Sequence, residues 1–142
     1  MFKSAKSVLI KSRKIDRGIG QYVERASRSL WPWRERWLLV VVSALCILDF
    51  MSTYGVLELS GRSNVYERGN LAAWALGVGE FPFLLLVDVV AVVVLSIVAL
   101  VSRHLYIRHG HSGYGRAAFV FILIPYIIIA TFAIINNIIL LL

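Results

Sequence analysis

The chain has 142 residues, of which 59% are hydrophobic and 16% charged, and its formal net charge is +7. Soluble domains are about 45–50% apolar, so this chain is too apolar to be covered by water. The composition excludes a water-soluble enzyme, a disulfide-stapled domain and a disordered tail. With a single cysteine, Cys46, no intrachain disulfide can form.

Residues 1–36 are basic and predict an amphipathic helix that lies on the membrane surface. Apolar residues recur at steps of three, four or seven: Val8, Ile15, Ile19, Tyr22, Val23, Ala26 and Leu30. The basic residues that we expect to contact anionic lipid head groups are Lys11, Lys14, Arg17, Arg25 and Arg28. A basic tail that only sets topology remains the alternative, and Gly18 and Gly20 would permit two short helices. A nucleic-acid partner is not expected, because basic tails beside a membrane span usually serve the membrane.

The boundary of this segment is marked by aromatic residues. Trp31, Trp33 and Trp37 predict an anchor at head-group level, and Pro32 breaks the preceding helix. We therefore divide the chain into a basic segment, 1–36, and a transmembrane bundle, 37–142.

Three apolar segments in the bundle have the length of a membrane span: 38–57, 81–101 and 118–142. Each is close to the ~20 residues that a helix needs to cross a bilayer. A continuous helix over 71–101 would be about 46 Å long, too long for a hydrocarbon core of ~30 Å. Residues 71–76 are therefore predicted to form a short interfacial or re-entrant helix. Gly77, Gly79 and Pro82 separate it from the second span, with Pro82 in the first turn of that span.

Lysine and arginine predict the orientation of these spans. Ten of the 15 basic residues precede the first span, three (Arg103, Arg108, Arg116) lie in the 102–117 loop, and two (Arg62, Arg68) lie between the first and second spans. The positive-inside rule then places the N-terminus inside and the C-terminus outside. The fold class is an all-α membrane protein with three transmembrane helices, a basic amphipathic N-terminal helix and a short interfacial or re-entrant helix. We expect the prokaryotic cytoplasmic membrane. An organellar inner membrane is the alternative, because the acid-free first 15 residues resemble a mitochondrial presequence.

This topology gathers polar side chains in the outer half of the bundle. Asp49, Ser52 and Thr53 share one face of the first span. Asp49 and Asp88 lie about 12 Å and about 9 Å below the outer surface at 1.5 Å per residue. The intramembrane cluster that we predict consists of Asp49, Ser52, Thr53, Asp88, Asn136 and Asn137, with Glu67, Asn70 and Glu80 of the outer connecting segment as further candidates.

Four interpretations of this cluster remain open. An acid inside a span costs about 2.5–3.5 kcal/mol on the insertion scale and normally has a partner within the protein. The carboxyl groups could be protonated, could bind a divalent cation such as calcium or magnesium, or could pair with a base from another subunit. Alternatively, the cluster is structural and joins helices by hydrogen bonds. A divalent cation is the only cofactor that these residues suggest.

Catalytic motifs are not found in the sequence. His104, His109 and His111 have a spacing that could contribute to a zinc site, but we favour a solvated basic loop for them, because a zinc site needs three or four well-placed ligands. No nucleophile is placed beside a base, and no phosphate-binding or zinc-protease motif is present. We predict no catalytic residues.

The motif LDFMSTYGV and the following ERGN resemble a family of small prokaryotic integral membrane proteins known only as a domain of unknown function. That family has Asp-x3-Thr in the first span, Glu-x-Asn-Pro before the second and an Asn in the last. The corresponding positions would be Asp49, Thr53, Glu67, Asn70 and Asn136. One extra residue separates Glu67 from Asn70, and Leu71 replaces the proline. The resemblance implies a short helical bundle and no known activity.

These patterns favour a non-catalytic integral membrane protein that acts as an accessory or scaffolding subunit. Its partners would be a membrane complex or further copies of itself, together with anionic lipids. A small ion- or metal-handling membrane protein that uses the outer carboxylates is the alternative.

Overall fold

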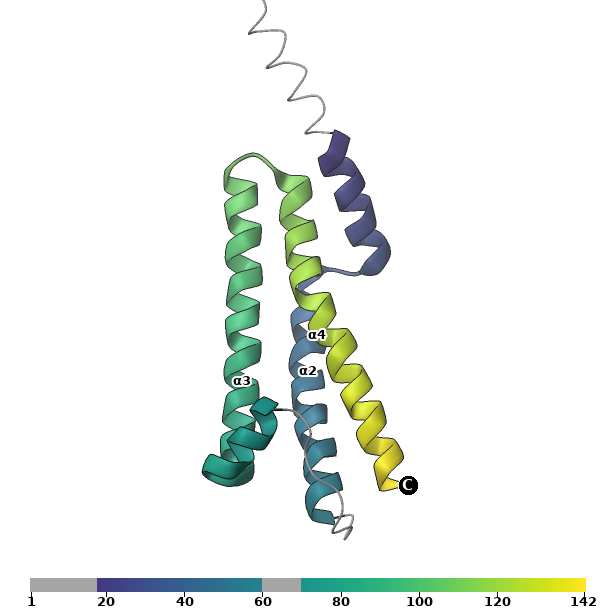
Figure 1. The fold of residues 1–142 in the computed structure, drawn as a ribbon. Coiled ribbons are helices and arrows are strands. Elements are labelled where there is room, and N and C mark those ends of the chain that lie inside the picture. Colours follow the sequence, from purple (N-terminus) through teal and green to yellow (C-terminus); the bar gives the residue numbers. More distant parts are fainter. Residues whose placement is uncertain (1–17, 60–69) are drawn as a thin grey trace, which may run out of the picture.

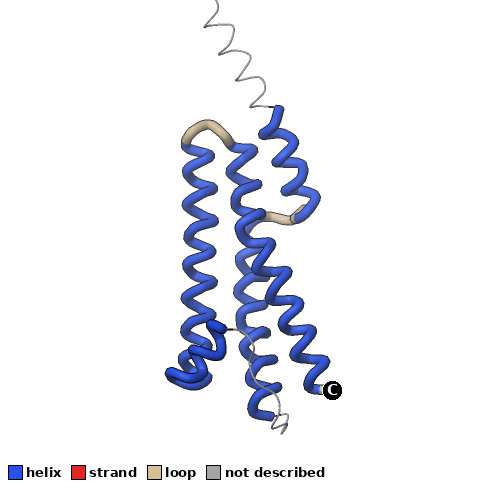
Figure 2. The backbone as a smooth tube through the Cα atoms, in the orientation of Figure 1, coloured by secondary structure: helices blue, strands red, loops and turns tan. Residues whose placement is uncertain are grey.

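A computed structural model describes residues 18–59 and 70–142, and all regular structure within them is helical (Figures 1 and 2). A helix over residues 18–30 is followed by α2 (Glu35–Tyr54), which ends in the short π-helix η1 (Gly55–Leu59). Then come α3 (Asn70–Arg108) and α4 (Ser112–Leu141). The all-α prediction is confirmed for these residues.

Three helical segments are long and apolar enough to cross a membrane: Glu35–Glu58, Ala73–Arg108 and Gly113–Leu141. They contain the three spans predicted from the sequence. The protein is therefore an integral membrane protein with three candidate spans, and α2, α3 and α4 form a bundle (Figure 1).

The core of the bundle is centred on α4, which packs against both α2 and α3 more extensively than those two helices pack against each other. Phe119, Val120 and Leu123 of α4 are almost fully buried, and they meet Leu38 and Val42 of α2. The remaining buried members of this core are Trp31, Cys46, Val92 and Ala99. Interdigitated apolar side chains thus fill the space between the three helices.

Glycine lets α3 and α4 approach closely beside the turn that joins them. A Cβ atom at Gly115 would lie 3.1 Å from the backbone oxygen of Arg103 and 3.0 Å from Cγ1 of Ile107. The helices extend further at this end than the sequence indicated. Most of the predicted 102–117 loop is helical, and only residues 109–111 form the turn. The prediction was wrong because a helix can continue beyond the apolar stretch that crosses the bilayer.

The helix over residues 18–30 lies beside the N-terminal part of α4. A Cβ atom at Gly113 would lie 2.7 Å from the backbone oxygen of Gly20, so only glycine fits there. Ser27 faces the bundle and is fully buried, with its hydroxyl donating to the Glu24 carbonyl oxygen at 2.7 Å. Ile19, Tyr22 and Leu30 of the predicted apolar stripe stay exposed. The helix thus packs on α4 through small residues and leaves these three apolar side chains uncovered.

A break interrupts α3 between its short first part, residues 70–78, and its long second part. Gly79 has φ −149° and ψ 23°, and Glu80 has φ 58° and ψ −154°, a region that residues with a side chain rarely occupy. Pro82 follows within the first turn after the break, as the sequence predicted. The rings of Trp74 and Phe83 meet edge to face at 5.5 Å and hold the two parts together. Whether the first part is interfacial or re-entrant stays a prediction.

The break gives a matched pair of glycine substitutions. We expect Gly79→Ala to lower the free energy of unfolding by about 1–3 kcal/mol, because overpacking of this size is costly and the new Cβ would lie 2.6 Å from Cβ of Phe83. Gly77 has nothing within 4 Å of its Cβ position. Gly77→Ala should therefore leave stability unchanged or raise it by up to about 1 kcal/mol. Thermal unfolding in detergent micelles measures both, and equal effects would contradict the tight contact at Gly79.

Candidate functional site

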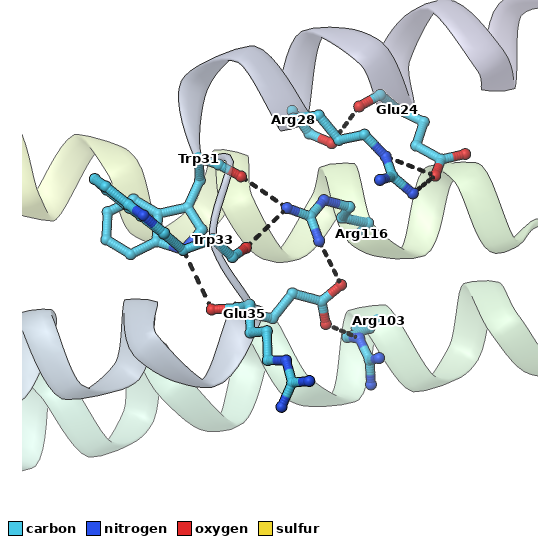
Figure 3. A network of polar contacts seen from close by, with 9 residues as sticks. Glu24, Arg28, Trp31, Trp33, Glu35, Arg103 and Arg116 are labelled. Atoms are coloured by element: carbon cyan, nitrogen blue, oxygen red, sulfur yellow. Dashed lines mark hydrogen bonds and ion pairs between the residues drawn. The ribbon is translucent and has the colours of Figure 1, made fainter.

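A network of charged groups joins α2, α3 and α4 at the end of the bundle where α3 turns into α4 (Figure 3). Glu35, in the first turn of α2, forms ion pairs with Arg103 of α3 and with Arg116 of α4. The Arg116 Nη1 atom lies 3.6 Å from Glu35 Oε1. We call Glu35, Arg103 and Arg116, with the carbonyl groups of Trp31 and Trp33, the interhelix junction.

Arg116 also binds the non-helical connection between residues 30 and 35. Its Nη2 atom donates to the carbonyl oxygen of Trp31 at 2.7 Å and to that of Trp33 at 3.1 Å (Figure 3). The Arg116 and Glu35 side chains are only 16% and 19% exposed. Trp31 is buried, and a buried carbonyl group without a donor costs about 1–3 kcal/mol. One guanidinium group therefore holds the start of α2, the connection and α4 together.

Trp31 differs from the two tryptophans that follow it. Its ring is buried in the core, packs edge to face on Trp33 at 5.0 Å, and donates through Nε1 to the Arg34 carbonyl oxygen at 3.3 Å. Trp33 and Trp37 are exposed, as a head-group anchor requires. The prediction of a three-tryptophan anchor was therefore wrong for Trp31, because its ring packs inside the protein beside the interhelix junction.

Three residues of the predicted intramembrane cluster meet between α2 and α4. The Asn137 side-chain amide donates to Ser52 Oγ at 3.0 Å and to Thr53 Oγ1 at 3.1 Å. Ser52 Oγ in turn donates to the Asp49 carbonyl oxygen at 2.9 Å. These contacts form a polar joint between two spans, of the kind that hydrogen bonds provide inside membranes.

The two acids of the cluster converge on a different pair of side chains. Cys46 of α2 and Tyr126 of α4 share a side-chain hydrogen bond. Asp49 and Asp88 both lie close enough to act electrostatically on this pair. The structure thus brings one acid from α2 and one from α3 to the same level of the bundle, where each has an interaction of its own.

Asn136 and Glu80 lie apart from these contacts. Asn136 is exposed on α4, on a different side from Asn137, and Glu80 is exposed at the break in α3. Asn70 begins α3, and Glu67 lies outside the described residues.

The predicted lipid-binding residues are only partly described. Lys11, Lys14 and Arg17 lie outside the described residues. Arg25 and Arg28 are exposed on the helix over residues 18–30. The Arg25 guanidinium lies 5.9 Å from the centre of the Tyr22 ring, and Arg28 pairs with Glu24 at 2.8 Å.

Within residues 18–59 and 70–142, no group of three or more His, Cys, Asp or Glu side chains is arranged to hold a metal ion. His104, His109 and His111 are all exposed. His109 Nδ1 lies 2.8 Å from the Leu105 carbonyl oxygen, and His111 packs edge to face on Tyr114 at 5.9 Å.

Sequence reasoning missed the interhelix junction, although a signal for it exists. It placed Arg103 and Arg116 at the same end of the bundle as the N-terminal segment but used them only to set orientation, and it did not consider Glu35. A lone glutamate between tryptophans and arginines, level with arginines at the ends of two other spans, is a recognisable ion-pair pattern. The Cys46–Tyr126 contact has no such signal, because it depends on how the helices are rotated.

Comparison of the chain with protein-family models, with curated proteins and with solved structures gives no match. The resemblance to small prokaryotic membrane proteins thus rests on its short motifs alone.

The junction predicts unequal effects for two arginine substitutions. Arg116→Ala should lower the free energy of unfolding by about 2–4 kcal/mol, because it removes the donor of two carbonyl groups and leaves Glu35 with one partner fewer. Arg28→Ala removes an exposed ion pair and should lower the free energy of unfolding by less than about 0.5 kcal/mol. Thermal unfolding in detergent compares them, and similar losses would show that the junction does not hold the helices together.

The polar joint predicts a coupling between α2 and α4. Asn137→Ala and Thr53→Val should each lower the free energy of unfolding. The double variant should lose less than the sum of the two single losses, with a coupling energy of about 0.6 kcal/mol. Asn136→Ala serves as the control, since Asn136 is exposed and should leave the thermal stability of the monomer unchanged. Additive losses in the double variant would contradict the joint.

Proposed function

We propose that the protein is a non-catalytic membrane scaffold, an accessory subunit that packs against itself or against another membrane complex. The observation that carries this proposal is the bonding of Asn137 to Ser52 and Thr53. Three polar residues of the predicted intramembrane cluster thus bond to one another between two helices, which supports a structural role for them.

The interhelix junction supports the same function. Glu35 pairs with both Arg103 and Arg116, and Arg116 also binds the backbone of the connection before α2, so these contacts tie the three helices together. All three spans keep large apolar side chains on their outer faces, among them Ile47 of α2, Val94 of α3 and Phe132 of α4. A rigid bundle with apolar faces on every side is suited to pack between other membrane helices.

Anionic lipid is part of this proposal. The helix over residues 18–30 exposes Arg25, Arg28 and an apolar stripe, which together suit an interface between head groups and acyl chains. Its place beside α4 puts it at the same end of the bundle as Arg103, Arg108 and Arg116. An excess of basic residues at one end favours the cytoplasmic side for that end.

The hypothesis that the protein handles ions or metals is supported only by the convergence of Asp49 and Asp88. We do not propose it as a second function.

Native electrophoresis of the full chain tests the scaffold proposal. After extraction in mild detergent, the protein should migrate as an assembly larger than its own monomer, because the scaffold would remain with its partners. The same sample dissociated in dodecyl sulfate marks the position of the monomer. A strictly monomeric species in mild detergent would overturn the proposal.

Reporter fusions test the proposed orientation. A reporter that is active only outside the cytoplasm should score positive after Leu142 or near Ser63, and negative near Ser112. This result follows from three crossings with an inside N-terminus, as the positive-inside rule predicts. Activity at Ser112 would show that the basic end of the bundle faces outward.

A further inference from the structure

The side of α4 that faces away from α2 and α3 carries a regular stripe of exposed residues. They follow one another at alternating steps of four and three: Pro125, Ile129, Phe132, Asn136 and Ile139. Ile129 and Phe132 are each 69% exposed, and Ile139 is 65% exposed. A four-three alternation keeps side chains on the contact line of two helices that wind around each other with a left-handed twist. We call these five residues the α4 seam.

Asn136 is the polar member of this seam. Its neighbour Asn137 bonds to Ser52 and Thr53 inside the bundle, whereas Asn136 is exposed on the outer face. Apolar residues stand on both sides of it in the sequence, from Ile134 and Ile135 to the five residues 138–142. Acyl chains offer an amide no hydrogen bond, so an outward Asn at this position needs a polar group from another molecule.

We infer that the α4 seam is the contact surface for a second copy of this chain, with Asn136 paired to Asn136 across a two-fold axis. A side-chain amide has both donors and an acceptor, so two copies of it satisfy each other. Copies of one chain insert in the same orientation, so the two α4 helices run parallel and each seam residue meets its own equivalent. A single Asn in a parallel two-helix seam fixes the register and the number of helices. The inference rests on the proposed scaffold function and names its partner.

No part of residues 18–59 or 70–142 covers the α4 seam, whose residues are all exposed. The helix over residues 18–30 contacts α4 at Gly113, at the opposite end from Asn136 (Figure 1). Phe132 and Ile139 lie about one turn before and after Asn136, so their side chains can close over the paired amides and keep them from lipid.

Disulfide crosslinking in native membranes tests the register. In full-length chains that also carry Cys46→Ala, we expect Phe132→Cys and Ile139→Cys to form covalent dimers on oxidation. Equivalent residues on such a contact line approach to the ~5–6 Å between Cα atoms that a disulfide requires. Ile138→Cys is the matched control, because Ile138 is exposed on the same helix but lies off the seam. Equal crosslinking at Ile138 would indicate random collision and would overturn the inference.

Energy transfer between labelled copies in lipid vesicles tests Asn136 itself. Asn136→Ala should weaken association about 3- to 30-fold, which corresponds to an interhelical hydrogen-bond energy of about 0.6–2 kcal/mol. Thr131→Val is the control: Thr131 is exposed on α4 but off the seam, and a helical threonine can bond to its own backbone. An unchanged association constant for Asn136→Ala would overturn the inference.

The results separate the inference from the proposed function. A larger assembly on native electrophoresis, without crosslinks at Phe132 and Ile139, would leave the scaffold in place and overturn the α4 seam as its contact. A monomer in native electrophoresis and in vesicles would overturn both. Should Asn136→Ala not fold, the crosslinking pattern in chains that retain Asn136 decides.

Discussion

The guanidinium group of Arg116 meets the carbonyl oxygens of Trp31 and Trp33 and the carboxylate of Glu35, and the arrangement of the helices depends on this contact. The connection before α2 cannot be helical through Pro32, so its carbonyl groups need a donor from elsewhere. Because α4 supplies that donor, the start of α2 is fixed beside the first turns of α4. Arg103 then joins α3 to the same level through Glu35. Beyond this level α3 and α4 continue by a few turns, and the helix over residues 18–30 packs on this part of α4.

Hydrophobicity and chain length predicted much of this architecture. Apolar runs identify spans because each backbone amide in a bilayer must bond within its own helix. The break before Pro82 was also predictable, since a helix across 71–101 would exceed the thickness of the hydrocarbon core. These arguments did not predict where each helix ends. Residues 102–108 and 112–117 are polar enough to leave the membrane yet stay helical, and hydropathy does not distinguish a polar helix from a loop.

For the candidate site, the sequence predicted how deep each polar residue lies in the bundle but not the direction in which its side chain points. Asn136 and Asn137 stand at the same depth, but neighbouring residues on a helix point about 100° apart. Packing of Phe119, Val120 and Leu123 against α2 sets the rotation of α4, and this rotation turns Asn137 inward and Asn136 outward. Rotation depends on the shapes of many side chains together, so a single sequence does not reveal it. The same reason explains why the contact of Cys46 with Tyr126, beside the predicted pair Asp49 and Asp88, was not predicted.

The central position of α4 has a consequence for biogenesis. Among the three spans this helix leaves the ribosome after the other two, yet it provides the main packing surface for both of them. While α4 is still in the exit tunnel, Glu35 has no access to Arg116, and Ser52 and Thr53 have no access to Asn137. The first two spans must therefore enter the bilayer as weakly associated helices with polar groups still unsatisfied. Assembly of the bundle must therefore wait until α4 has entered the bilayer, and a membrane insertase or chaperone that shields those groups would act before that step.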